Sequence, residues 1–273
     1  MLAMLLDGCR AIWKFRGYKP QPLTMKGFRT WLEQFDHEDQ RYVLDLLKEV
    51  VFVSETETRR LLTERNEALL KKLAKDGISL KKIIYIQFDD AASSSAVMLN
   101  LLKENARLEG KCTFLDSKDI RGVHEATKKL GEGAVIYVDD FIGTGNQFCR
   151  SRDYTAQYFV GTFSEFLLAA CVCEEAFYRL GERGIEAIPG MIHSRSQRPL
   201  DAYNSTFGAK EKERLIELCR GIDRTGGLGY KGLATMVVFY RNAPNTLPVL
   251  FRGNVKQTPF IGLLPRTTDL PFK

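Results

Sequence analysis

The sequence has few of the residues that build metal or disulfide frameworks. Its 273 residues include six cysteines, with no C-x-x-C pair, and three histidines, with no His-x-x-x-His spacing. Six cysteines are too few to form a disulfide scaffold in a chain of this length, and the histidine pattern argues against a structural zinc site. We expect the thiols to pack as small apolar side chains, and we expect a reduced, cytoplasmic setting.

Long apolar runs are also missing. The longest uninterrupted one extends from Phe166 to Cys173, whereas a membrane-spanning helix needs about 20 apolar residues. The opening MLAMLL has no basic residue before it and is too short for the apolar part of a signal peptide. The sequence therefore predicts neither a membrane segment nor a cleaved leader.

The charge balance gives only a weak indication of partners. The chain has 40 basic and 34 acidic residues, a net charge of +6 at pH 7, and its basic residues are dispersed rather than clustered. Such an excess suits a polyanion or a phosphorylated substrate, although a solvated basic surface is the default explanation.

The hydrophobic pattern divides the chain into two regions. Residues 1–80 are predicted to form a helical region, because apolar residues recur there at spacings of three and four. From residue 81 to 273, short apolar runs alternate with helical patterns, which is typical of an α/β domain whose mostly parallel sheet is flanked by helices. The expected strands are 83–88, 112–115, 134–138, 165–173, 184–193 and 234–240.

One loop combines acids with anion donors. The strand expected to end at Val138 is followed by Asp139 and Asp140, and then by a turn with the sequence GTGNQ at residues 143–147. Glycines let backbone amides approach an anion, and a helix N-terminus adds a favourable dipole. Carboxylates beside an anion site need sugar hydroxyls or Mg²⁺ between them. The loop therefore predicts a sugar-phosphate site, with a strand-to-helix turn capped by acids as the alternative.

A second loop follows the first expected strand. It contains Asp89 and Asp90, and then Ser93, Ser94 and Ser95 at the start of a helix. Hydroxyl and amide donors at a helix N-terminus can bind an anion, but an ordinary serine N-cap is the simpler alternative. In an open parallel sheet, ligands collect outside the carboxyl ends of the strands, where both loops are expected to lie.

The segment AVIYVDDFIGTGNQF resembles the phosphoribosyl pyrophosphate motif of type I phosphoribosyltransferases. The resemblance implies that Asp139 and Asp140 face the ribose hydroxyls and serve catalysis. It further implies three groups of contacts: Gly143, Thr144, Gly145, Asn146 and Gln147 with the 5-phosphate; Ser93, Ser94 and Ser95 with the pyrophosphate; Asp89, Asp90, Asp139 and Asp140 with Mg²⁺. Because the serine loop has no basic residue, Arg195 and Arg198 are candidates to balance the pyrophosphate. Gln147 departs from the motif, which usually has threonine there.

A wider resemblance includes MVVFYRNAPNTLPVLFR, residues 236–252. The chain is similar to a subgroup of phosphoribosyltransferase-like proteins from bacterial conflict and phage-defence systems, some of which act as toxin effectors beside retron reverse transcriptases. Three hypotheses stay open: an Mg²⁺-dependent phosphoribosyltransferase acting on phosphoribosyl pyrophosphate or a nucleotide, a catalytically idle binding module, and a subunit docking a reverse transcriptase with structured RNA or single-stranded DNA. A homo-oligomer is compatible with each.

Overall fold

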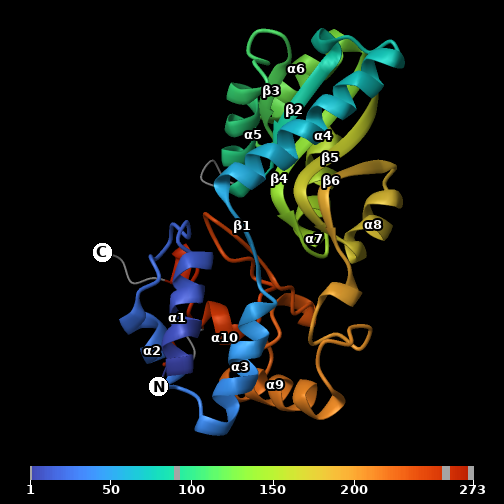
Figure 1. Cartoon of the computed structure of the whole chain (residues 1–273). Coiled ribbons are helices and arrows are strands. Elements are labelled where there is room, and N and C mark those ends of the chain that lie inside the picture. The colour runs from blue at the N-terminus through green and yellow to red at the C-terminus, as the bar shows by residue number, and fades with distance from the viewer. Residues whose placement is uncertain (1, 89–92, 254–258, 270–273) are drawn as a thin grey trace. The chain divides into compact units, whose positions relative to one another are not determined.

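The chain packs as two units. A computed structural model describes residues 2–88, 93–253 and 259–269 (Figure 1). Residues 56–193 form one unit, here called the sheet unit, while residues 1–55 and 194–273 together form the other, the terminal unit. This division differs from the predicted boundary at residue 80, because the long helix of residues 55–75 belongs almost entirely to the sheet unit.

The sheet unit contains five parallel strands in the order β3-β2-β4-β5-β6. The chain leaves β2 toward β3 on one side and then returns to place β4 on the other side, so the strand order reverses between β2 and β4. In open parallel sheets, ligands bind at such a reversal. The predicted mostly parallel α/β fold is confirmed. The strands are β2 (Ile83–Gln87), β3 (Thr113–Asp116), β4 (Glu132–Ile142), β5 (Thr162–Cys173) and β6 (Ile185–His193).

Helices cover both faces of this sheet. On one face, α4 contacts β2 through a 2.7 Å hydrogen bond from the Tyr85 hydroxyl to Asn66, and Arg59 of α4 donates to Asn105 of α5. On the other face, α6, α7 and α8 share an apolar cluster with the strands, centred on residues such as Phe148 and Leu180. The helices are α4 (Glu55–Lys75), α5 (Ser94–Asn105), α6 (Ile120–Leu130), α7 (Asn146–Ala156) and α8 (Glu174–Gly181).

The terminal unit brings both ends of the chain into one core. The buried indole of Trp31 donates a 2.7 Å hydrogen bond to the Leu250 carbonyl, and the Tyr18 hydroxyl donates to the Pro265 carbonyl at 2.7 Å. The guanidinium of Arg214 holds the buried Asp39 carboxylate through two 2.7 Å bonds. The elements are α1 (Leu2–Lys14), α2 (Met25–Leu32), α3 (His37–Lys48), β1 (Val51–Val53), α9 (Ala209–Ile222), β7 (Val237–Phe239) and α10 (Val249–Arg252).

Two expectations about strands are wrong. The apolar run at 234–240 does not extend the main sheet, because its residues Val237–Phe239 pair in parallel with Val51–Val53 in a separate two-stranded sheet. The strand Val51–Val53 interrupts the region 1–80, which the sequence predicts to be helical. A run of β-branched and aromatic residues between two helices favours an extended backbone. Within the described residues, no helix combines the length and apolar character needed to cross a membrane.

The six cysteines are all free thiols of unequal accessibility. Cys9 is exposed, Cys112 is half-buried, and the other four are buried. Burial raises the pKa of Cys112 to about 11 and that of Cys219 to about 12, which leaves little thiolate to react. We therefore expect a thiol reagent at pH 8 to label Cys9 first. Cys9→Ser should remove the fast phase, and a fast phase that survives this change would contradict the burial pattern.

Candidate functional site

The two predicted acids lie inside a strand rather than after it. β4 continues to Ile142, four residues beyond its predicted end at Val138. Its pairing with β2 is recorded from Ala134 to Tyr137, whereas its pairing with β5 extends to Ile142. Hydrogen bonds to β5 keep the backbone extended through both aspartates, which sequence patterns could not show. The acids therefore lie at the carboxyl end of β4, beside the point where the strand order reverses.

Both carboxylates lie below the molecular surface. Asp139 is 6% exposed and Asp140 is 8% exposed, and an Asp139 oxygen accepts a 2.9 Å hydrogen bond from the Asp140 amide. Tyr137 and Ile142, before and after the aspartates in β4, pack in the apolar cluster of the sheet unit, so the two carboxylates lie next to this core.

The bend after β4 has backbone donors available for an anion. Within the described part of the chain, the amides of Gly143, Thr144 and Gly145 have no intramolecular acceptor. Gly145 is the N-cap of α7, with a left-handed φ of 75°, and its carbonyl accepts the Cys149 amide at 2.8 Å. The bend therefore leads directly into the N-terminus of α7, where partial positive charge favours an anion. Asn146 and Gln147 form the first turn of that helix.

Gly145 offers a test of the bend itself. A methyl group there would meet the Ala176 side chain at an ordinary 3.6 Å, so the cost of Gly145→Ala comes from its positive φ. We expect a loss of about 1–2 kcal/mol in the free energy of unfolding, measured by urea denaturation. Gly181→Ala is the matched control. Gly181 lies in a helix, and a methyl group there would meet nothing within 4 Å, so this substitution should leave the free energy of unfolding unchanged or raise it. Equal losses in both variants would contradict the left-handed cap.

The serine loop uses two of its three hydroxyls internally. Ser95 is fully buried, and its oxygen accepts the Phe88 amide at 3.0 Å. Ser93 caps α5 by accepting the Ala96 amide at 3.4 Å, and it donates to the Phe88 carbonyl. These bonds fix the start of α5 against the end of β2, which leaves the Ser94 hydroxyl as the better ligand candidate. The predicted metal ligands Asp89 and Asp90 lie outside the described residues, and pyrophosphate binding by Ser93, Ser94 and Ser95 stays a prediction.

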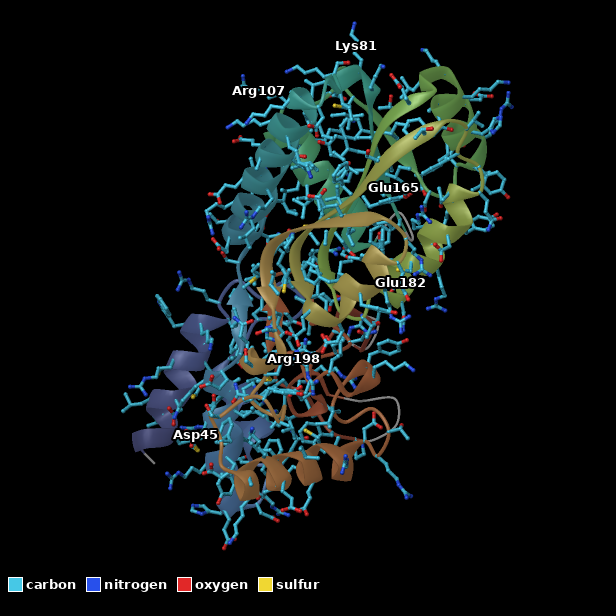
Figure 2. All side chains as sticks on the ribbon, turned by 90° about the vertical axis from the view of Figure 1, so that its right-hand side faces the viewer. Asp45, Lys81, Arg107, Glu165, Glu182 and Arg198 are labelled. Atoms are coloured by element: carbon cyan, nitrogen blue, oxygen red, sulfur yellow. The ribbon has the colours of Figure 1, made fainter. Side chains whose placement is uncertain are left out.

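The two candidate arginines belong to the terminal unit, whereas both predicted anion loops belong to the sheet unit. Arg195 pairs with Asp201 at 2.9 Å, and its guanidinium lies 4.4 Å from the ring centre of Tyr203. Arg198 is 1% exposed and is labelled in Figure 2. Their assignment to pyrophosphate stays a prediction.

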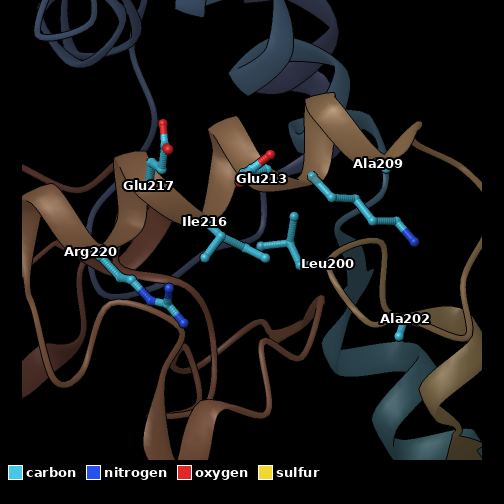
Figure 3. A pocket seen from close by; sticks show the side chains of 8 residues that line it. Leu200, Ala202, Ala209, Glu213, Ile216, Glu217 and Arg220 are labelled. Carbon is cyan, nitrogen blue, oxygen red and sulfur yellow. The ribbon is translucent and has the colours of Figure 1, made fainter.

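The terminal unit also has a cavity of about 510 Å³ along α9 (Figure 3). Its rim carries charges of both signs, and the Lys212 ammonium already donates to the carbonyls of Asp201 and Asn204. Mixed charge gives this cavity no preference for an anion. The lining residues are Leu200, Ala202, Ala209, Lys212, Glu213, Ile216, Glu217 and Arg220.

The fold and the site define an α/β protein with a candidate anion site where its strand order reverses. The sequence model of the PRTase-CE family matches residues 28–266, and the chain belongs to this family. No curated protein matched the sequence.

Solved structures give fold-level comparisons only. Orotate phosphoribosyltransferase from Aeropyrum pernix is 15% identical over 50% of this chain and 72% of its own, with a TM-score of 0.32. A hypothetical protein from Neisseria gonorrhoeae with bound ppGpp is 13% identical over 62% of this chain and 97% of its own, with a TM-score of 0.36. Hypoxanthine-guanine phosphoribosyltransferase from Schistosoma mansoni with IMP is 12% identical over 52% and 68%, with a TM-score of 0.32. The family assignment rests on the sequence match.

Proposed function

We propose that the sheet unit binds the ribose 5-phosphate part of phosphoribosyl pyrophosphate or of a related nucleotide, at the carboxyl ends of β2 and β4. One observation carries this proposal. A pair of nearly buried carboxylates and a bend with available amides follow each other on one strand end, beside the reversal of strand order. Carboxylates accept from sugar hydroxyls, and amides donate to phosphate oxygens.

Each group of residues would bind the part of the ligand that its chemistry suits. The amides of Gly143, Thr144 and Gly145, with the α7 N-terminus, would hold the 5-phosphate. Asp139 and Asp140 would orient the ribose by accepting hydrogen bonds from its hydroxyls, and their negative charge would favour positive charge developing on the sugar ring. Such a site works mainly by positioning and electrostatics, so a glycosyl transfer there needs no nucleophilic side chain.

The donor chemistry also fits Mg²⁺. This ion prefers oxygen ligands and often takes one or two protein carboxylates together with substrate phosphates. Asp139 and Asp140 supply such carboxylates, and the described residues contain no group of three or more acidic, cysteine or histidine side chains that could hold a metal by themselves. When bound, Mg²⁺ would neutralise charge on a departing pyrophosphate.

Isothermal titration calorimetry tests the proposal. We expect phosphoribosyl pyrophosphate with Mg²⁺ to bind with a Kd between about 1 μM and 1 mM, the range typical of enzyme substrates. Ribose 5-phosphate should bind more weakly, and 2-deoxyribose 5-phosphate more weakly still, because the acids lose a hydroxyl partner. No heat with any of these ligands, at protein concentrations near 100 μM, would remove the proposal.

Product formation distinguishes a phosphoribosyltransferase from a binding module without turnover. An exposed Gln147 in place of the motif's threonine removes one hydroxyl donor, which favours a binding module without turnover. Release of pyrophosphate in the presence of candidate bases supports the transferase, while ligand binding without any product supports the idle module. The toxin-effector and phage-defence role and the retron reverse transcriptase stay predictions of the resemblance. The cytoplasmic location stays a prediction from cysteine usage, and a homo-oligomer stays a prediction compatible with each hypothesis.

A docking subunit has one observation in its favour. Residues 194–273 contain 13 basic and six acidic residues, whereas residues 56–193 contain 19 basic and 20 acidic residues. The excess positive charge of the chain therefore lies in the terminal unit, as a polyanionic partner would require. A gel shift with structured RNA and with single-stranded DNA tests this second function. Unchanged mobility at 100 mM salt, alone and beside a reverse transcriptase, would count against it.

A further inference from the structure

A buried charged network joins the far half of α7 to the sheet. The Arg152 guanidinium grips the Glu165 carboxylate of β5 with two nitrogens, of which Nε lies 2.8 Å from one oxygen. The same oxygen accepts a 2.9 Å hydrogen bond from the Tyr137 hydroxyl of β4. Figure 2 labels Glu165 on its strand. One carboxylate thus connects α7 with two neighbouring strands.

The network is shielded from water. The Glu165 side chain is 10% exposed and that of Arg152 is 18% exposed, while Tyr137 is fully buried. Burial, together with the neighbouring Glu165, raises the pKa of the Tyr137 phenol well above its usual value, so that the phenol stays a hydrogen-bond donor. A buried carboxylate is tolerated only when its oxygens are satisfied in good geometry, and here both are.

A second ion pair extends the network to the next helix. Arg183, just after α8, grips Asp153 of α7 through three hydrogen bonds of 2.8–3.0 Å. Hydrogen bonds from Arg183 lower the pKa of Asp153. Arg152 also contacts Asp153 at 3.3 Å. Because Asp153 is more exposed than Glu165, the inner pair is the stronger constraint.

Such a network fixes the helix along its axis in a way that apolar contacts do not. Phe148 and Cys149 pack α7 on the sheet through apolar contacts, which are non-directional. Two parallel hydrogen bonds from one guanidinium to one carboxylate form at a single position of the helix. A shift of about 1–2 Å along the helix axis lengthens them beyond hydrogen-bond distance. A helix transmits that constraint to its other end, where Gly145 and the donor bend lie.

We propose that Arg152 and Glu165 are positioning residues for the candidate ribose-phosphate site, and that they hold the bend at residues 143–145 in register with Asp139 and Asp140. The Tyr137 hydroxyl links the pair to β4 two residues before the first of these acids. This inference rests on the proposed function, since it concerns how tightly that site holds its ligand rather than which groups touch it.

The test compares affinity with stability in two inner variants. We expect Glu165→Gln and Arg152→Met to raise the Kd for phosphoribosyl pyrophosphate with Mg²⁺ about tenfold, because a displacement of about 1 Å loosens bonds to the phosphate. Arg152→Lys keeps the charge and loses the planar grip, so an intermediate Kd is expected. Binding is measured by calorimetry at 10 °C, where circular dichroism first confirms that each variant is folded.

One control and one further variant keep the outcome decisive. Arg60→Gln breaks an exposed pair with Glu57 and Glu64 on α4 of the same unit, and it should leave the Kd unchanged. Tyr137→Phe removes only a hydroxyl and serves if the charge variants do not fold, with an expected two- to threefold weaker binding. A lower melting temperature with an unchanged Kd would overturn the positioning role alone. Failure of the parent protein to bind would overturn it together with the proposed function.

Discussion

Asp139→Asn with Asp140→Asn is expected to weaken binding of phosphoribosyl pyrophosphate by about 100-fold or more. Each carboxylate would accept hydrogen bonds from the ribose or hold a metal ion, and a charge-assisted hydrogen bond contributes about 1.5–3 kcal/mol. Two such losses exceed the roughly 2.7 kcal/mol that corresponds to 100-fold. Calorimetry with Mg²⁺ measures the change, and each single variant should show part of it.

The same substitution should not unfold the protein. Asparagine has nearly the same shape as aspartate and keeps a side-chain oxygen that can accept the Asp140 amide. The double variant is therefore expected to fold, and its melting temperature is measured beside its affinity, which separates ligand binding from folding. Asp76→Asn, an exposed acid of the same unit, is the matched control with no expected effect on affinity. Unchanged affinity in the double variant would mean that the acids do not face the ligand.

The parallel sheet was predictable because its strands are short apolar runs. Residues such as Ile84, Ile136 and Leu168 are fully buried in a sheet covered by helices on both faces. Such strands have no solvent-exposed face, so their sequences do not alternate between apolar and polar residues. The same logic failed at the end of β4. There Asp139 and Asp140 end the apolar run, although pairing with β5 continues to Ile142, and pairing depends on a distant strand that the local pattern does not contain.

Strand partners were harder to predict than strands. The run at Val237–Phe239 has the composition of a buried strand, yet it pairs with Val51–Val53 rather than with β6. Propensity describes whether a segment fits a pleated surface and says nothing of which neighbour it meets. The two-unit division follows from this pairing, because it joins segments nearly 190 residues apart in the chain.

The acids and the bend of the candidate site were recognisable in the sequence, whereas the pair of Arg152 and Glu165 was not. Adjacent acids followed by a Gly-Thr-Gly bend form a local pattern, and the structure places both at the reversal of strand order. The pair of Arg152 and Glu165 has no local pattern, since its members are 13 residues apart and meet only after α7 folds back on the sheet. A lone glutamate at the start of the apolar run 165–173 was the available signal, because burying a carboxylate requires a partner.

The largest effect on stability is expected from Trp31→Ala in the terminal unit. This indole is 1% exposed, lies between Phe28, Phe35 and Phe251, and donates to the Leu250 carbonyl. Removing it opens a cavity and leaves a buried carbonyl without that donor, at a cost of about 3–5 kcal/mol. Total stabilities of domains are about 5–15 kcal/mol, so urea unfolding should shift markedly.

Trp13→Ala provides the matched control, since it is the same substitution at a side chain that is 70% exposed. Its ring contacts the Arg16 guanidinium at 4.4 Å, an exposed cation–π contact whose loss costs about 1 kcal/mol or less. Because Trp31 joins α2 to the segment around α10, its loss should also expose residues 249–252 to limited proteolysis while the sheet unit stays intact. Equal stability losses in the two variants, or simultaneous cleavage of both units, would show that this indole does not join the two ends of the chain.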